Sequence, residues 1–84
     1  MVSFHLDSKN SDVIQMCYNV EREETVFVSF RNALGITFLT QKIFLRKDLK
    51  EVMLNTSNLL TGRYFIKIYS SQLKHDSVEY TKDC

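Results

Sequence analysis

The sequence predicts an all-β domain of six or seven short strands, arranged as an antiparallel β-sandwich or as a small barrel. Apolar residues alternate with a period of two along almost the whole chain, as in strands with one buried face. Turn-like segments recur at intervals of roughly 8–12 residues. No proline and only two glycines interrupt the chain, and 84 residues is the size of one domain, so we expect a single domain over residues 1–84.

The first half of the chain contains the clearest strand signals. Residues 13–20 form one strand, and its apolar side chains share a face: Ile14, Met16, Tyr18 and Val20. A charged turn follows over residues 21–24. Residues 25–31 form the next strand, and its inward side chains are Val26, Val28 and Phe30. The pattern at residues 2–6 is weaker and indicates an opening strand.

The segment Asn32-Ala33-Leu34-Gly35 interrupts the alternation. Asn and Gly both tolerate positive φ, so this segment predicts a tight connection between two antiparallel strands. The strand that follows, residues 36–45, is apolar on both faces. One face holds Phe38 and Phe44, and the other holds Leu39, Ile43 and Leu45. The charged residues 46–50 are expected on the surface.

The second half of the chain supplies the remaining elements. Residues 51–55 form a short strand, and residues 56–62 are expected to form a single helical turn that tucks Leu59 under the sheet. Residues 63–70 form a strong strand and residues 77–81 a final one. Val52 and Leu54 are the inward side chains of the strand over residues 51–55, and Tyr64, Ile66 and Ile68 share one side of the strand over residues 63–70. A helix over residues 48–60 is the weaker alternative, because four consecutive Asn, Thr and Ser residues compete for the backbone.

The two cysteines, Cys17 and Cys84, are too few for a disulfide scaffold. A bridge between them would close nearly the whole chain and contribute about 4–5 kcal/mol. We expect instead a buried Cys17 and a free Cys84, since chain ends fray. No apolar segment typical of a signal peptide follows Met1. No apolar run approaches the roughly 20 residues of a spanning helix, so we expect no membrane insertion.

No catalytic machinery is visible in the sequence. His5 and His75 lie near opposite ends of the chain, and neither belongs to a motif. A thiol nucleophile at Cys17 is the weakest hypothesis. No spacing typical of metal ligands is present, and two isolated glycines form no phosphate loop, so we expect no metal and no cofactor. A net charge of +1 argues against nucleic-acid binding. The chain is therefore expected to be a non-enzymatic protein that binds or is bound.

Large apolar residues occupy both faces of residues 36–45 and 63–69, where one face of a sheet is usually polar. This excess predicts either a partner surface or scattered surface aromatics. A basic segment over residues 42–50 predicts either contact with an anionic partner or a solvated loop. The residues of this predicted partner surface are Phe65, Lys67, Tyr69, Lys42, Arg46, Lys47 and Lys50.

From Val26 onward, two stretches follow a known pattern: Val-Phe-Val-Ser-Phe-Arg-Asn-Ala-Leu-Gly, and later Leu-Leu-Thr-Gly-Arg-Tyr-Phe-Ile-Lys-Ile. Over about residues 13–81 the chain resembles the C-terminal sorting domain of proteins exported by the type IX secretion system of Bacteroidota. It also resembles related small immunoglobulin-like sandwiches of that phylum. The matching residues mark a turn and the segment that places Leu59 under the sheet: Asn32, Gly35, Leu59, Gly62 and Tyr64. The chain lacks the Pro-Asn-Pro opening of that family.

The resemblance implies an immunoglobulin-like β-sandwich that serves as a non-catalytic recognition module for secretion sorting or in the cell envelope. It implies a secreted or periplasmic location, and without it the cytoplasm is expected. Recognition would use an exposed edge or face formed by the last two strands, residues 63–70 and 77–81. Edge strands also permit an edge-strand dimer. The alternative is a free-standing small binding protein, an inhibitor or effector, that uses the aromatic face and an edge strand. Both hypotheses imply a protein partner.

Overall fold

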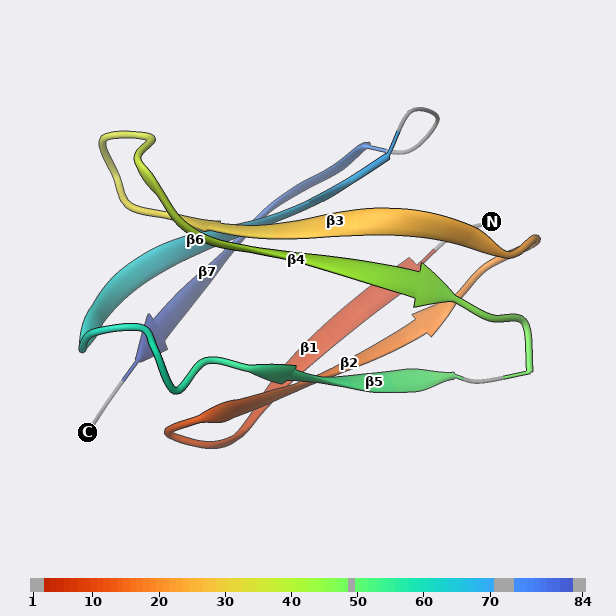
Figure 1. The fold of residues 1–84 in the computed structure, drawn as a ribbon, viewed down its shortest axis with the longest axis horizontal. Helices are drawn as coiled ribbons and strands as arrows, with labels where there is room; N and C mark the ends of the chain where they lie inside the picture. Colours follow the sequence, from red (N-terminus) through yellow and green to blue (C-terminus); the bar gives the residue numbers. More distant parts are fainter. Residues whose placement is uncertain (1–2, 49, 71–73, 83–84) are drawn as a thin grey trace.

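The computed structural model describes residues 3–48, 50–70 and 74–82, with only the backbone described for residues 3 and 74–77. Over these residues the chain consists of strands and their connections, without a helix (Figure 1). The strands, in chain order, are β1 (Ser3–Asn10), β2 (Val13–Asn19), β3 (Glu24–Arg31), β4 (Thr37–Leu45), β5 (Glu51–Asn55), β6 (Gly62–Tyr69) and β7 (Lys74–Lys82). The all-β prediction is confirmed.

The strands form two antiparallel sheets. The three-stranded sheet has the order β1-β2-β5, and the four-stranded sheet has the order β4-β3-β6-β7. In Figure 1 the four-stranded sheet lies above the three-stranded one. The strands β1 and β7 are longer than the alternation predicted. β1 pairs with β2, and β7 pairs with β6. The neighbouring strand supplies backbone hydrogen-bond partners even where the side chains of β1 or β7 do not alternate.

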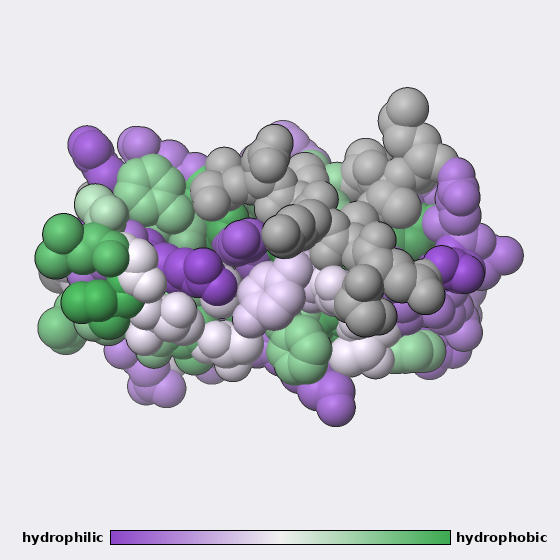
Figure 2. Space-filling view, turned by 90° about the horizontal axis from the view of Figure 1, so that it is seen from above, coloured by the Kyte–Doolittle hydropathy of each residue, from purple (hydrophilic) through white to green (hydrophobic). Residues whose placement is uncertain are grey.

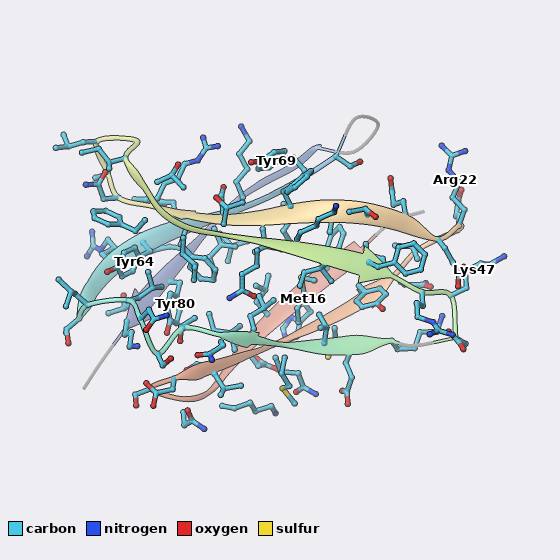
Figure 3. All side chains as sticks on the ribbon, in the orientation of Figure 1. Met16, Arg22, Lys47, Tyr64, Tyr69 and Tyr80 are labelled. Atoms are coloured by element: carbon cyan, nitrogen blue, oxygen red, sulfur yellow. The ribbon has the colours of Figure 1, made fainter. Side chains whose placement is uncertain are left out.

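One hydrophobic core fills the space between the sheets. It combines side chains from both layers: Ile14, Met16, Tyr18, Val20, Val26, Val28, Phe30, Leu45, Leu54, Leu59, Tyr64, Ile66 and Ile68. Tyr80 of β7 packs against this core. Its ring lies 6.1 Å from that of Phe30 in an edge-to-face arrangement and 6.4 Å from that of Tyr64 in a stacked one. Figure 3 shows Met16, Tyr64 and Tyr80 between the layers.

The β3–β4 hairpin is closed by Asn32 and Gly35. The Gly35 N–H donates to the Asn32 carbonyl at 3.0 Å, and Gly35 has a φ of 85°, which suits glycine. The Asn32 side-chain oxygen accepts hydrogen bonds from the N–H groups of Leu34 and Ile36 at 2.9 and 3.0 Å. Local hydrogen bonds therefore hold this turn in shape.

A bulge beside this hairpin gives Phe38 a contact that the alternation did not predict. Phe30 pairs with Leu39 and Arg31 pairs with Thr37, so Phe38 has no partner on β3. The bulge turns its ring towards the inner residue Tyr64, at a centroid distance of 5.8 Å. Phe38 nevertheless stays 55% exposed, the same fraction as Phe44, and Leu39, Ile43 and Leu45 are less exposed, in line with the predicted alternation.

The β5–β6 connection contains a β-turn and not the expected helical turn. The Leu59 N–H donates to the Thr56 carbonyl at 3.0 Å, three residues back. Thr56 is tied outside the segment, because its own N–H donates to the Asp12 carbonyl at 2.7 Å. Leu59 is buried as expected. The hydrogen bond from Thr56 to Asp12, outside the segment, takes the place of the i to i+4 bonds that a helix would form.

Lys82 of β7 is buried, and its ammonium connects three parts of the chain. It donates a hydrogen bond to the Thr56 carbonyl and lies 3.5 Å from the Asp12 carboxylate. We expect Lys82→Met, which keeps most of the apolar stem, to lower the free energy of unfolding by about 1–3 kcal/mol, because the charge-assisted bond is lost. Urea denaturation followed by circular dichroism measures this. The exposed Lys47→Met should change stability by less than about 0.5 kcal/mol, and equal effects would contradict the role of Lys82.

Candidate functional site

The outer face of the four-stranded sheet gathers aromatic and cationic side chains. We call it the aromatic–basic face, and its residues are Phe27, Arg31, Lys42, Phe65, Lys67 and Tyr69. The strand register places Lys42, Phe27 and Tyr69 in one row across β4, β3 and β6. The next row contains Thr40, Ser29 and Lys67, and beyond it Arg31 lies opposite Phe65. Alternation along β3 directs these side chains away from the core.

Two aromatic rings form the centre of the first row. Phe27 and Tyr69 are stacked, with ring centroids 5.7 Å apart and planes inclined by 28°. Phe27 is 37% exposed, which is high for a phenylalanine on a central strand. In Figure 3, Tyr69 lies on the side of the sheet opposite to Met16. Figure 2 looks onto this side and shows hydrophobic and hydrophilic residues interleaved across it.

Polar groups in the next rows lack partners. Ser29 is only 1% exposed, and neither its hydroxyl oxygen nor the buried Nε of Arg31 has a hydrogen-bond partner among the described residues. Within the same part of the chain, no carboxylate forms an ion pair with Arg31 or Lys67. A pocket of about 270 Å³ opens beside them and is lined by Arg31, Lys67, Tyr69 and Ser70. The face therefore combines apolar area with unused donors.

Only part of the predicted partner surface comes together here. Lys42, Phe65, Lys67 and Tyr69 lie on the aromatic–basic face. The other predicted cations, Arg46, Lys47 and Lys50, lie in the connection between β4 and β5.

Those three residues have local partners. The Arg46 guanidinium pairs with Asp48 at 3.2 Å, and the Lys47 N–H donates to the Glu23 carboxylate at 3.4 Å. The Lys50 ammonium lies 3.5 Å from the Asn19 side-chain oxygen. This basic segment links the two sheets and does not extend the face.

Sequence reasoning missed Phe27, Ser29 and Arg31. The signal was present, because these residues alternate with Val26, Val28 and Phe30, whose inward direction was predicted. Their importance was not visible, since it depends on Lys67 and Tyr69 of β6, which pair beside β3.

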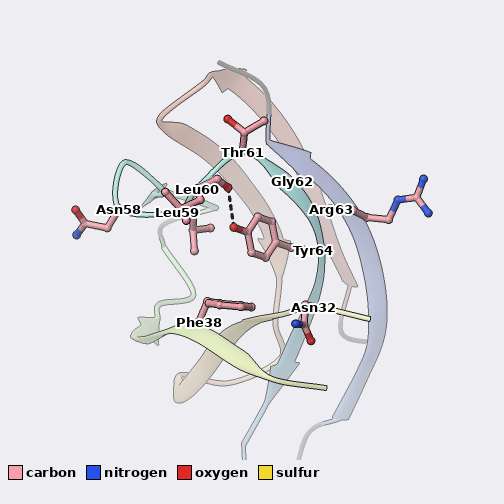
Figure 4. Close-up of a pocket in the computed structure, with 9 residues that line it drawn as sticks. All are labelled: Asn32, Phe38, Asn58, Leu59, Leu60, Thr61, Gly62, Arg63 and Tyr64. Atoms are coloured by element: carbon pink, nitrogen blue, oxygen red, sulfur yellow. Dashed lines mark hydrogen bonds between the residues drawn. The ribbon is translucent and has the colours of Figure 1, made fainter. Parts of the chain in front are cut away.

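A second pocket, of about 410 Å³, lies at the end of the molecule that carries the β3–β4 hairpin. Its apolar walls are Phe38, Leu59, Leu60 and Tyr64, which Figure 4 shows facing one another. The Tyr64 hydroxyl donates to the Leu60 carbonyl at 2.6 Å. Leu34 and Leu60, 84% and 81% exposed, add apolar surface at the same end.

The residues that carry the resemblance to sorting domains also gather at this end. Asn32, Leu59, Gly62 and Tyr64 line the pocket, and Gly35 closes the neighbouring hairpin. None of them belongs to the aromatic–basic face. In this structure they shape a hairpin, a turn and the start of β6.

Cys17 lies on the outer face of the three-stranded sheet and is partly exposed, so the expectation of a buried thiol was wrong. The register places His5 and Glu51 directly opposite it on β1 and β5, around a pocket of about 330 Å³. The His5 Nε2 lies 3.2 Å from the Asp7 carboxylate. Over the described residues, no group of three His, Cys, Asp or Glu side chains is arranged to hold a metal ion. Cys84 lies outside the described residues.

Comparison with known proteins finds no matching family, no similar curated protein and no similar solved structure. In the part of the chain that the structure describes, no helix is long and apolar enough to cross a membrane. The resemblance to secretion sorting domains therefore stays a prediction.

Proposed function

We propose that this chain is a non-catalytic β-sandwich module that recognises a protein partner through its aromatic–basic face. One observation carries the proposal: the aromatic side chains and the cations of this face lie next to one another on the outer side of a single sheet. Aromatic residues and arginine are enriched in the centres of protein interfaces, where they supply most of the binding energy. Charged side chains around them select the partner and orient it.

The strand order supports an immunoglobulin-like sandwich as the framework of this module. With the strands lettered A to G in chain order, the sheets are A-B-E and D-C-F-G. Immunoglobulin constant-type domains have the sheets A-B-E-D and C-F-G. The difference is the fourth strand, which pairs here with the third strand and widens the sheet that bears the aromatic–basic face.

Two further predictions concern the partner. A role in secretion sorting would make the export machinery the partner, and an edge-strand dimer would make it a second copy of the chain. The edges open to such pairing are β4 and β7 in one sheet and β1 and β5 in the other. The aromatic–basic face lies mainly on β3 and β6, inside the sheet, so it favours recognition by side chains over strand addition.

Substitution of the stacked pair tests the proposal. A partner is first captured with the intact chain and identified, and its dissociation constant is then measured with purified proteins. We expect Phe27→Ala with Tyr69→Ala to weaken binding at least about 30-fold, since central aromatic anchors contribute 2 kcal/mol or more.

The control is Met53→Ala, which removes a large exposed side chain from the outer face of the other sheet. It should leave the dissociation constant within about twofold of the original. Circular dichroism establishes that both variants are folded. Unchanged binding by the folded Phe27→Ala, Tyr69→Ala variant would overturn the proposal.

A further inference from the structure

We propose that Ser29, Arg31 and Lys67 form an anion subsite on the aromatic–basic face, and that it takes a carboxylate from an acidic segment of the protein partner. The inference rests on the proposed function for the nature of the partner. The subsite itself rests on the placement and the unpaired donors of three neighbouring side chains.

The three residues are neighbours on one face. Ser29 and Lys67 lie directly opposite each other on β3 and β6. Arg31 follows Ser29 by two residues on the same side of β3, which places it diagonally across from Lys67. A hydroxyl, a guanidinium and an ammonium are therefore carried at neighbouring positions of two adjacent strands.

Ser29 and Arg31 each have a donor that the described part of the molecule leaves unused. The Ser29 hydroxyl and the Arg31 Nε are both buried without a hydrogen-bond partner. Buried polar groups are nearly always paired, since an unpaired one has lost its hydration without compensation. A bound anion would supply the missing acceptor, and guanidinium and ammonium groups are the usual protein donors to carboxylates.

The neighbouring pocket has room for such a group. It measures about 270 Å³ and is lined by Arg31, Lys67, Tyr69 and Ser70. The lining residue Tyr69 is stacked on Phe27. An apolar side chain next to the bound carboxylate would pack on those rings.

A negative charge at one margin favours an isolated carboxylate over a polyanion. Glu79, opposite Phe65, pairs with Arg63 at 3.7 Å. A nucleic-acid backbone crossing the sheet in that direction would pass the Glu79 carboxylate, whereas one acidic side chain can reach Arg31 and Lys67 without approaching it.

Two capped peptides test the subsite: acetyl-Gly-Glu-Phe-Gly-amide and its glutamine analogue, titrated into the isotopically labelled full chain. Nuclear magnetic resonance follows the backbone amides of Ser29 and Lys67 and the Arg31 Nε–H. We expect these signals to shift with the glutamate peptide and its affinity to exceed that of the glutamine peptide at least about fivefold. No shift at these groups, or equal affinity for both peptides, would overturn the subsite.

Variants distinguish charge-dependent binding of the glutamate peptide from non-specific binding to the apolar surface. Arg31→Gln with Lys67→Gln should abolish the preference for glutamate, whereas the matched pair Lys47→Gln with Lys50→Gln, away from this face, should keep it. Ser29→Ala should weaken the glutamate peptide without destabilising the fold, because it removes a hydroxyl that has no partner. A preference retained by Arg31→Gln, Lys67→Gln would contradict the assignment.

Two further probes identify the source of the anion. Inorganic phosphate and a short single-stranded oligothymidylate are titrated under the same conditions. Tighter binding of either than of the glutamate peptide would overturn the carboxylate assignment. If the captured partner binds Arg31→Gln, Lys67→Gln normally but loses the Phe27→Ala, Tyr69→Ala variant, the subsite is wrong while the proposed function stands.

Discussion

Phe30→Ala is expected to lower the free energy of unfolding by about 3–5 kcal/mol. Phe30 lies on the central strand β3, is fully buried, and packs edge-to-face on Tyr80. Its removal takes a large apolar side chain from the core and leaves a cavity between the sheets. Because a domain of this size is stable by only about 5–15 kcal/mol, this one change is expected to remove a large share of the total. Urea denaturation followed by circular dichroism measures the loss.

The matched control is Phe44→Ala on the neighbouring strand β4. Phe44 is 55% exposed and points away from the core, so its loss should change stability by less than about 0.5 kcal/mol. The same chemical change is then expected to cost a large part of the stability on one face of the sheet and almost none on the other. Similar losses in both variants would contradict the two-layer arrangement.

A chain that ends at Ser70 is expected not to fold. It loses β7 and with it the partner strand of β6, so a row of backbone N–H and C=O groups becomes exposed. It also loses Tyr80, which contacts both Phe30 and Tyr64, and the buried Lys82. We expect loss of the β-sheet signal in circular dichroism and of chemical-shift dispersion in nuclear magnetic resonance.

The control keeps β7 and changes only its outward side chains. Glu79→Ala with Thr81→Ala alters two exposed residues opposite Phe65 and Arg63 and should leave the fold intact. A folded chain ending at Ser70 would show that β7 is dispensable. Recognition through β7 is therefore better tested with such substitutions than by deletion.

The core could be read from the amino-acid sequence because burial of one face imposes a period of two. Val26, Val28 and Phe30 are predicted inward, and Tyr64, Ile66 and Ile68 are predicted to share one side of their strand. All six are buried. This signal is local and strong, since a shift of one residue would exchange a whole apolar face for a polar one. The Asn32–Gly35 turn was also predictable from a local signal, because Asn and Gly suit a turn backbone that few other residue types adopt.

Pairings between distant segments were not visible. His5 lies opposite Cys17, although neither histidine formed a motif with it. A bulge places the ring of Phe38 beside Tyr64. The Thr56 N–H donates to the Asp12 carbonyl, and the segment forms a β-turn and not a helical turn. Each of these features depends on residues distant in the sequence or on one extra residue in a strand. The alternation of apolar residues contains information on neither.

For the candidate site as well, some features follow from the sequence and others only from the tertiary structure. Amino-acid order determines that Phe27, Ser29 and Arg31 point away from the core, since their direction follows from their buried neighbours. The pairing of β3 with β6 decides that Lys67 and Tyr69 stand beside them, and so creates the stacked rings and the unpartnered donors. Alternation specifies the face of a strand, but long-range hydrogen bonding chooses its neighbour, and a binding surface requires both.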